Sequence, residues 1–191
     1  EEQIFGMDVH HAVLGIVGLG RIGEAIARRA VHGFSMTLLY HNRSRNAAAE
    51  EKYGARYCAL DELLRASDFV VLMMPLTPDT AGFFGKEHFE KMKPTAFFIN
   101  ASRGGVVREA DLVAALREGR IRGAGLDVYE CEPVSPDNPL LKMPNVVTLP
   151  HIGSATAKTR HAMAALAVRN LTAVLRGVPG AHIVRELADL A

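Results

Sequence analysis

The sequence is poor in cysteine, in net charge and in long apolar runs. Its two cysteines, Cys58 and Cys131, are too few for a disulfide scaffold and suggest a reducing compartment, so we expect a cytoplasmic protein. The 22 basic and 21 acidic residues leave a net charge of +1, so no global field attracts nucleic acid or an anionic membrane. No apolar run approaches the roughly 18 to 20 residues that span a bilayer. We therefore expect neither a nucleic-acid partner nor a membrane segment.

The chain also lacks an initial methionine and a secretory signal pattern. It opens with Glu1-Glu2-Gln3, which predicts that it starts inside a longer protein or after trimming. A hydrophobic content of 49% over 191 residues excludes a disordered chain. It supports one sizeable domain, or a large domain with part of another.

Apolar runs alternate with helix-like segments along the chain. The runs expected to form strands are Val13–Leu19, Met36–Tyr40, Arg56–Cys58, Phe69–Met74, Ala96–Asn100, Ala124–Val128 and Val146–Leu149. The segments expected to form helices are Gly23–His32, Leu60–Ala66, Lys86–Met92, Glu109–Glu118 and Ala155–Arg176. The runs do not alternate in polarity, so we expect strands buried on both faces. Such strands separated by helices predict an α/β fold, a Rossmann-type doubly wound parallel sheet of about seven strands.

The sharpest motif is a glycine-rich turn directly after the first expected strand and at the start of a helix. It reads Gly18-Leu19-Gly20-Arg21-Ile22-Gly23, and this strand–turn–helix setting is typical of a dinucleotide fingerprint. Gly18 permits the tight turn, Gly20 lets the backbone approach a pyrophosphate, and Gly23 lets the helix lie close to the strand. The N–H groups of the helix N-terminus then face the phosphates, so Arg21 and Ile22 join the candidates for coenzyme binding. The alternative is a glycine-rich turn without a ligand.

The end of the second expected strand lacks the acid that binds the ribose 2′-hydroxyl in most NAD sites. Residues 25–49 contain no acidic residue at all. A carboxylate would repel a 2′-phosphate, whereas a guanidinium can bind it by two hydrogen bonds. Arg43 is the best candidate for that contact, with Ser44 and Arg45 as helpers, Asn42 beside it, and His41 where the acid would stand. This favours NADP(H), with NAD(H) still possible; the alternative is a solvated loop.

Charged residues follow several other strands at the carboxyl ends, where open α/β sheets bind ligands. Arg103 presents a rigid, permanently charged fork that can hold a substrate carboxylate and polarise a carbonyl. Histidine is the side chain suited to give and take a proton under physiological conditions, and His151 follows the last expected strand. A neighbouring carboxylate favours the imidazolium and orients its ring, and spacing alone does not choose between Glu130 and Glu132. Taken singly, the arginine could be a surface residue and the histidine a core residue.

The reduction of a 2-keto acid needs three groups: one that holds the substrate anion, one that donates a proton and one that carries a hydride. Arg103 and His151 are candidates for the first two. Asp127 is expected at the nicotinamide end, as an acceptor for the nicotinamide amide. The other coenzyme-binding candidates at strand ends are Pro75, Thr77, Ala101 and Gly153. The remaining histidines show no metal-ligand spacing with acids, so we expect no metal site.

Four segments, in order, resemble the signature blocks of the D-isomer-specific 2-hydroxyacid dehydrogenases. They read LGIVGLGRIGEAIARR, FINASRGGVV, GAGLDVYECEP and LPHIGSAT, and the resemblance extends from about residue 8 to residue 179. It implies that Arg103 is the catalytic arginine, that Glu132, directly before a proline, is the catalytic glutamate, and that His151 is the catalytic histidine. The HNRSR stretch is similar to the NADPH-preferring glyoxylate/hydroxypyruvate and 2-ketogluconate reductase branch.

The resemblance implies an NADPH-dependent oxidoreductase that reduces glyoxylate, hydroxypyruvate or a similar small 2-keto acid to the D-2-hydroxy acid. It implies that residues 1–176 form the NAD(P)-binding domain and that 177–191 belong to, or dock on, a substrate domain mostly absent from this chain. It also implies a homodimer. The alternative is an NAD(H)-sensing scaffold similar to C-terminal-binding corepressors, which share the fold and the same three residues.

Overall fold

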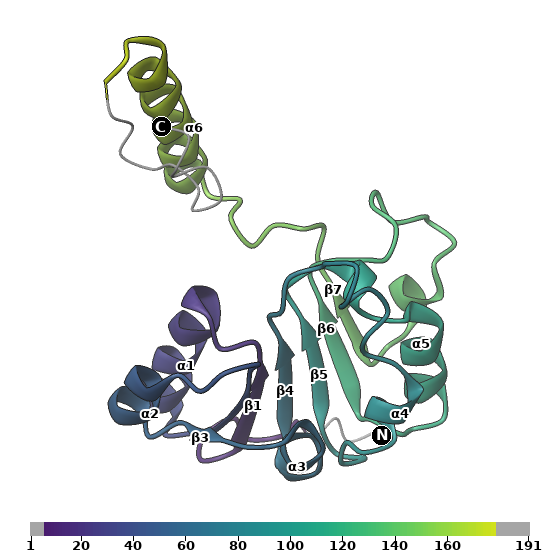
Figure 1. Cartoon of the computed structure of the whole chain (residues 1–191). Helices are drawn as coiled ribbons and strands as arrows, with labels where there is room; N and C mark the ends of the chain where they lie inside the picture. Colours follow the sequence, from purple (N-terminus) through teal and green to yellow (C-terminus); the bar gives the residue numbers. More distant parts are fainter. Residues whose placement is uncertain (1–5, 179–191) are drawn as a thin grey trace. The chain divides into compact units, whose positions relative to one another are not determined.

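Seven parallel strands form the sheet, in the order β3-β2-β1-β4-β5-β6-β7 (Figure 1). The strands are β1 (Val13–Val17), β2 (Thr37–His41), β3 (Arg56–Tyr57), β4 (Phe69–Leu72), β5 (Phe97–Asn100), β6 (Gly123–Leu126) and β7 (Val146–Thr148). The predicted α/β class with a parallel sheet is therefore confirmed. Because the order reverses between β1 and β4, the carboxyl ends of these two strands flank the crevice where such sheets bind ligands.

This computed structural model describes residues 6–178. The chain divides into two compact units, Glu1–His151 and Ile152–Ala191, and the larger unit contains the whole sheet. Its helices are α1 (Arg21–Phe34), α2 (Ala47–Tyr53), α3 (Leu60–Ala66), α4 (Lys86–Phe89) and α5 (Glu109–Arg117), with short 3-10 turns at Gly104–Val106 and Pro139–Lys142.

Two apolar cores lie on opposite faces of the sheet. Adjacent residues of β2 point to different cores, since Leu38 packs with residues of α1 and α2 and Leu39 packs with residues of α3, α4 and α5. Both are 2% exposed, so the strand is buried on both faces, as its unbroken apolar sequence predicts. In Figure 1, α1 and α2 accordingly lie on one side of the strands and α4 and α5 on the other.

The boundaries differ from the sequence prediction in a few places. Helix α1 begins at Arg21, two residues before the expected Gly23, because Gly20 occupies the N-cap position. Strand β1 ends at Val17 rather than at Leu19, where the chain already turns. Helix α2 was not predicted: only Ala49 and Tyr53 of its residues are buried, so no apolar periodicity marks it.

The smaller unit contains α6 (Ala157–Leu175), within the helix expected over 155–176. The Thr156 side chain accepts a hydrogen bond from the backbone N–H of Thr159 at 3.2 Å and so caps the helix N-terminus. Gly177, at a φ of +64°, follows its C-terminus. Apart from Gly177 and Val178, the predicted C-terminal tail lies outside the described residues. Over residues 6–178, every helix is too short or too polar to cross a membrane.

Candidate active site

The glycine-rich turn joins β1 to α1 at the crevice beside β4. Gly18 has a φ of +104°, and a Cβ there would lie 2.7 Å from the carbonyl carbon of Met73. A Cβ at Gly23 would lie 2.7 Å from the carbonyl oxygen of Gly18. Both positions therefore need glycine, for different reasons: a left-handed conformation at the first and helix–strand contact at the second. A Cβ at Gly20 would have no other atom within 4 Å, so the backbone there is open to an approaching ligand.

The N-terminus of α1 fits an anion. Its N-cap Gly20 supplies no side-chain cap, and the first helical hydrogen bond runs from the N–H of Glu24 to the carbonyl of Gly20 at 2.8 Å. The N–H groups of Arg21, Ile22 and Gly23 precede that bond and have no acceptor in the preceding turn of the helix. Together with the helix dipole they provide the donors and the partial positive charge that a pyrophosphate requires.

At the end of β2, His41 and Asn42 are turned toward the protein. The His41 ring donates from Nδ1 to the carbonyl oxygen of Cys58 at 3.0 Å and stacks on Tyr57, with ring centroids 6.0 Å apart. The Asn42 side-chain amide contacts the backbone of Leu19 in the glycine turn, at 2.7 Å from Oδ1 and 3.3 Å from Nδ2.

The two arginines of this loop differ in their surroundings. Arg45 donates from Nε and Nη2 to the two carboxylate oxygens of Glu50, at 3.0 and 2.6 Å. Hydrogen bonds from Arg45 and from the Tyr40 hydroxyl lower the pKa of Glu50 to about 2. Arg43 and Ser44 are exposed, and within residues 6–178 their side chains have no hydrogen-bond or ion-pair partner. Of the two guanidinium groups, that of Arg43 is the one left for a ligand.

The loop after β5 is held by a buried asparagine. Asn100, 2% exposed, accepts hydrogen bonds at Oδ1 from the backbone N–H and the hydroxyl of Ser102, at 3.0 and 2.8 Å. Its Nδ2 donates to the carbonyl of Arg103 at 3.2 Å. Next to it, a Cβ at Gly104 would lie 1.8 Å from the carbonyl oxygen of Tyr129. The loop that carries Arg103 therefore lies directly against the loop after β6.

Glu132 and His151 meet at the same edge of the sheet. His151 Nδ1 donates to Glu132 Oε2 at 2.7 Å, and the backbone N–H of Tyr129 donates to Glu132 Oε1 at 3.0 Å. The His151 hydrogen bond, and to a smaller degree the charge of Arg103, lower the pKa of Glu132. The His151 side chain is 47% exposed and the Glu132 side chain 35% exposed, so solvent reaches both. Glu130 lies elsewhere, its carboxylate 3.4 Å from the backbone N–H of Glu109.

The backbone of His151 is unusual. Its φ is +55°, in the left-handed region that non-glycine residues seldom occupy. Such a conformation costs roughly 1–2 kcal/mol, and conformations of this kind are found preferentially at functional sites.

The other predicted binding residues are spread over separate loops. After β4, the Thr80 hydroxyl donates to the carbonyl of Pro75 at 2.7 Å and accepts from the N–H of Thr77 at 2.7 Å, which closes a turn. Ala101 is exposed between Asn100 and the Arg103 loop, and Asp127 is half-buried at the end of β6. Gly153 belongs to the smaller unit, two residues after His151 in the sequence.

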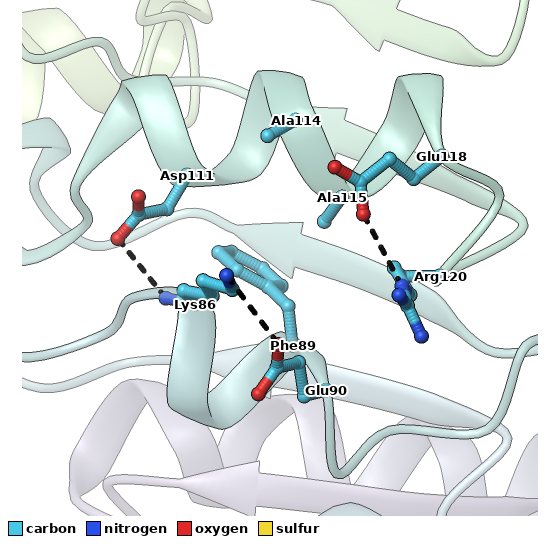
Figure 2. Close-up of a pocket in the computed structure, with 8 residues that line it drawn as sticks. All are labelled: Lys86, Phe89, Glu90, Asp111, Ala114, Ala115, Glu118 and Arg120. Atoms are coloured by element: carbon cyan, nitrogen blue, oxygen red, sulfur yellow. Dashed lines mark hydrogen bonds and ion pairs between the residues drawn. The ribbon is translucent and has the colours of Figure 1, made fainter.

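A separate shallow pocket lies between α4 and α5 and contains none of the predicted site residues (Figure 2). Its volume of about 70 Å³ is far below the roughly 300 Å³ of small-molecule sites. Four of its five charged groups are paired with one another, Lys86 with Glu90 at 3.8 Å and Arg120 with Glu118 at 3.3 Å. The fifth, Asp111, pairs with Arg108 outside the pocket at 2.7 Å. Residues 6–178 contain no cluster of three His, Cys, Asp or Glu side chains that could hold a metal ion.

The model of the D-isomer specific 2-hydroxyacid dehydrogenase NAD binding domain matches residues 1–153. The chain belongs to this dehydrogenase family. Glyoxylate/hydroxypyruvate reductase B of Escherichia fergusonii is 60% identical to it over 173 residues, which are 91% of this chain and 53% of that protein. The chain thus spans about half the length of the curated relatives that it matches.

Solved structures of similar proteins share the fold. The NADPH-dependent glyoxylate/hydroxypyruvate reductase of Sinorhizobium meliloti, solved with NADP and malonate, is 40% identical, with a TM-score of 0.83 over 92% of this chain and 53% of that chain. The D-lactate dehydrogenase of Lactobacillus jensenii, solved with NAD+, is 28% identical, with a TM-score of 0.86 over 96% of this chain and 58% of that chain. Proteins of this fold thus include one solved with NADP and one solved with NAD+.

Three residues that shape this candidate site were not singled out from the sequence. Asn100 and Gly104 determine where the Arg103 loop lies, and Asn46 joins Asn42 at the glycine turn, 3.4 Å from the carbonyl oxygen of Leu19. The glycine pair directly after Arg103 is one local signal. Asn46 is another, because its side chain accepts from the N–H of Ala49 and so caps the N-terminus of α2. The contacts that place these residues at the site, from Gly104 to Tyr129 and from Asn46 to Leu19, join residues that are distant in the sequence.

Proposed function

We propose that the protein is an NADPH-dependent reductase that converts a small 2-keto acid, such as glyoxylate or hydroxypyruvate, into the D-2-hydroxy acid. The observation that carries the proposal is the 2.7 Å hydrogen bond between His151 and Glu132 at the carboxyl edge of the sheet, beside the Arg103 loop. The glycine turn, which fits a dinucleotide, is on the same edge. The 60% identity to a glyoxylate/hydroxypyruvate reductase supports this substrate class.

Each of the three side chains has a distinct task. Arg103 binds the substrate carboxylate with its fork of N–H donors, which orients the carbonyl carbon toward the coenzyme. Bound at the glycine turn, the nicotinamide coenzyme supplies the hydride. His151, whose Nδ1 is engaged by Glu132, donates the proton to the carbonyl oxygen from Nε2. The Glu132 carboxylate stabilises the charged imidazole and fixes its orientation.

The surroundings of Arg43 support NADPH as the preferred coenzyme. Its guanidinium is exposed and unpaired within the described residues, whereas Arg45 is bound by Glu50. The residues from 25 to 49 bring no carboxylate that would repel a 2′-phosphate. Arg43 and Ser44 bind that phosphate, and NAD(H) is the weaker coenzyme.

Coenzyme oxidation tests the proposal directly. The protein that carries this chain is mixed with glyoxylate or hydroxypyruvate and either NADPH or NADH, and absorbance at the nicotinamide band is followed. We expect turnover with both keto acids, faster with NADPH at limiting coenzyme. Glycolaldehyde is the control, because it has the carbonyl but no carboxylate for Arg103 to hold. Tight coenzyme binding without any turnover would contradict the proposal and favour the coenzyme-sensing scaffold.

The assembly and the location belong to the same proposal. We propose a homodimer in the cytoplasm with a small-molecule substrate and with no nucleic-acid or membrane partner. The near-neutral net charge of +1 supports the absence of a nucleic-acid partner. Light scattering during size-exclusion chromatography tests the dimer, and a monomer over the micromolar range would contradict it.

A further inference from the structure

We propose that Asn42 is a positioning residue, which holds the glycine turn against the end of β2 so that the turn keeps the shape that receives the pyrophosphate. In this role Asn42 does not touch the coenzyme. The inference rests on the proposed coenzyme function of this edge, and it replaces the expectation that Asn42 is itself a coenzyme ligand.

The Asn42 amide occupies both polar backbone groups of Leu19. Its Oδ1 accepts from the N–H of Leu19 at 2.7 Å, and its Nδ2 donates to the carbonyl oxygen of Leu19 at 3.3 Å. The side chain thus pairs with Leu19 as a neighbouring strand would, at a point where β1 has already ended. The last backbone hydrogen bond between the two chain segments runs from the N–H of Gly18 to the carbonyl of His41 at 3.0 Å. The Asn42 side chain extends the β1–β2 contact one residue beyond that bond.

Leu19 is fixed from its other side by the core. Its side chain is 1% exposed and packs in the core shared with α1 and α2. The turn is therefore anchored at Leu19 by two contacts: the Leu19 side chain packs in the core, and the Leu19 backbone bonds the Asn42 amide. Asn46 adds a second contact, since its Nδ2 lies 3.4 Å from the carbonyl oxygen of Leu19 and 2.9 Å from Oε1 of Glu24 in α1.

These contacts predict which coenzymes lose affinity when Asn42 is changed. The turn between Gly18 and Gly20 faces the pyrophosphate, which NADPH and NADH share. Loss of the amide leaves the N–H of Leu19 without its partner and the carbonyl with only the contact from Asn46. The turn then relaxes, so both coenzymes lose the same binding energy. A direct contact from Asn42 to the 2′-phosphate would instead weaken NADPH alone.

The experiment compares two variants of Asn42 with a matched control in the full 191-residue chain. Asn42→Ala removes both hydrogen bonds to Leu19. Asn42→Asp keeps an oxygen that accepts from the Leu19 N–H. Asn145→Ala is the control, because Asn145 also bonds a backbone carbonyl, that of Arg122 at 3.3 Å, in a different part of the chain. Dissociation constants for NADPH and NADH and the hydrogen-exchange rate of the Leu19 amide are measured at a temperature where every variant is folded.

We expect Asn42→Ala to weaken NADPH and NADH by the same factor, roughly tenfold, and to accelerate exchange of the Leu19 amide in the coenzyme-free chain. Asn42→Asp should restore slow exchange and bring NADH affinity to within about threefold of wild type. NADPH should recover less, because the new carboxylate repels a 2′-phosphate. Asn145→Ala should bind both coenzymes like wild type.

Two outcomes would overturn the positioning role alone: a loss of NADPH affinity with unchanged NADH affinity, or unchanged Leu19 exchange in Asn42→Ala. A wild-type chain that binds neither coenzyme would overturn the proposed function, and the positioning role with it. The wild-type measurement therefore separates the two failures.

Discussion

The two ends of the carboxyl edge are built in different ways. At the β1–β2 end, the polar side chains mostly bind the protein itself: Asn42 holds Leu19, and Arg45 holds Glu50. At the β5–β7 end, the pair formed by Glu132 and His151 is one-third to one-half exposed, with one ring nitrogen of the histidine free of the carboxylate.

This difference separates binding from chemistry. A pyrophosphate is recognised by backbone N–H groups, so side chains near it serve best by fixing the backbone. A proton donor must meet the substrate, so its side chain stays accessible while a neighbour fixes its orientation. Substitutions at the β1–β2 end should therefore change coenzyme affinity, and substitutions at the β5–β7 end should change turnover.

The largest effect is expected from His151→Ala. Removing the proton donor should lower turnover of glyoxylate by about 10² to 10⁴-fold, because general acid catalysis contributes that much. Coenzyme affinity should stay within a few-fold of wild type, since the glycine turn is untouched. Steady-state kinetics and coenzyme titration measure the two quantities. Unchanged turnover would refute the proton-donor role. It would also refute the assignment of chemistry to the β5–β7 end.

Gly104→Ala tests how the Arg103 loop is held. The new Cβ would lie 1.8 Å from the carbonyl oxygen of Tyr129, so the two loops must separate. We expect the free energy of unfolding to fall by up to about 3 kcal/mol, as for other overpacked sites. Gly33→Ala in α1 is the matched control: nothing lies within 4 Å of its Cβ, and alanine should stabilise that helix by roughly 0.5–1 kcal/mol. Urea denaturation measures both changes in unfolding free energy. Equal changes for Gly104→Ala and Gly33→Ala would mean that the contact between Gly104 and the Tyr129 carbonyl is not tight.

Arg43→Asp tests the exposed arginine at the β1–β2 end. It replaces a guanidinium by a carboxylate, so NADPH affinity should fall by roughly tenfold or more while NADH affinity changes less. Titration with both coenzymes gives the ratio of the two losses. An equal loss for NADPH and NADH would mean that Arg43 does not bind the 2′-phosphate.

The smallest effect concerns Glu50, which binds Arg45 and leaves Arg43 available. Its pKa is lowered from 4.5 to about 2, so its contribution to stability is fully present above pH 4.5 and is lost as the pH falls toward 2. The difference in unfolding free energy between wild type and Glu50→Gln should therefore shrink over that window and stay constant from pH 5 to 7. Denaturation at a series of pH values measures it. A difference that is independent of pH would show that the Arg45 contact does not hold Glu50 ionised.

Much of the sheet could be predicted from the sequence because its signals are local. Every strand except β3 (Arg56–Tyr57) is a short apolar run, and the spacing of Gly18, Gly20 and Gly23 already gives the turn that joins β1 to α1. Helix α2 was missed because it buries only two of its residues and has no apolar repeat. The predicted roles of Arg103, Glu132 and His151 remain predictions.

The sequence by itself determined the alternation of strands and helices, the glycine positions of the turn and the kinds of side chain that follow each strand. Only the tertiary structure decided that Arg45 rather than Arg43 meets Glu50 and that Gly104 lies at the Tyr129 carbonyl. Spacing in the sequence did not choose between Glu130 and Glu132; the family resemblance implied Glu132, and the structure shows it bonded to His151. The physical reason is the sequence distance over which each kind of interaction acts. Periodicity and turn chemistry act between neighbours in the chain, whereas a hydrogen bond between Glu132 and His151 depends on how separate strands place their following loops.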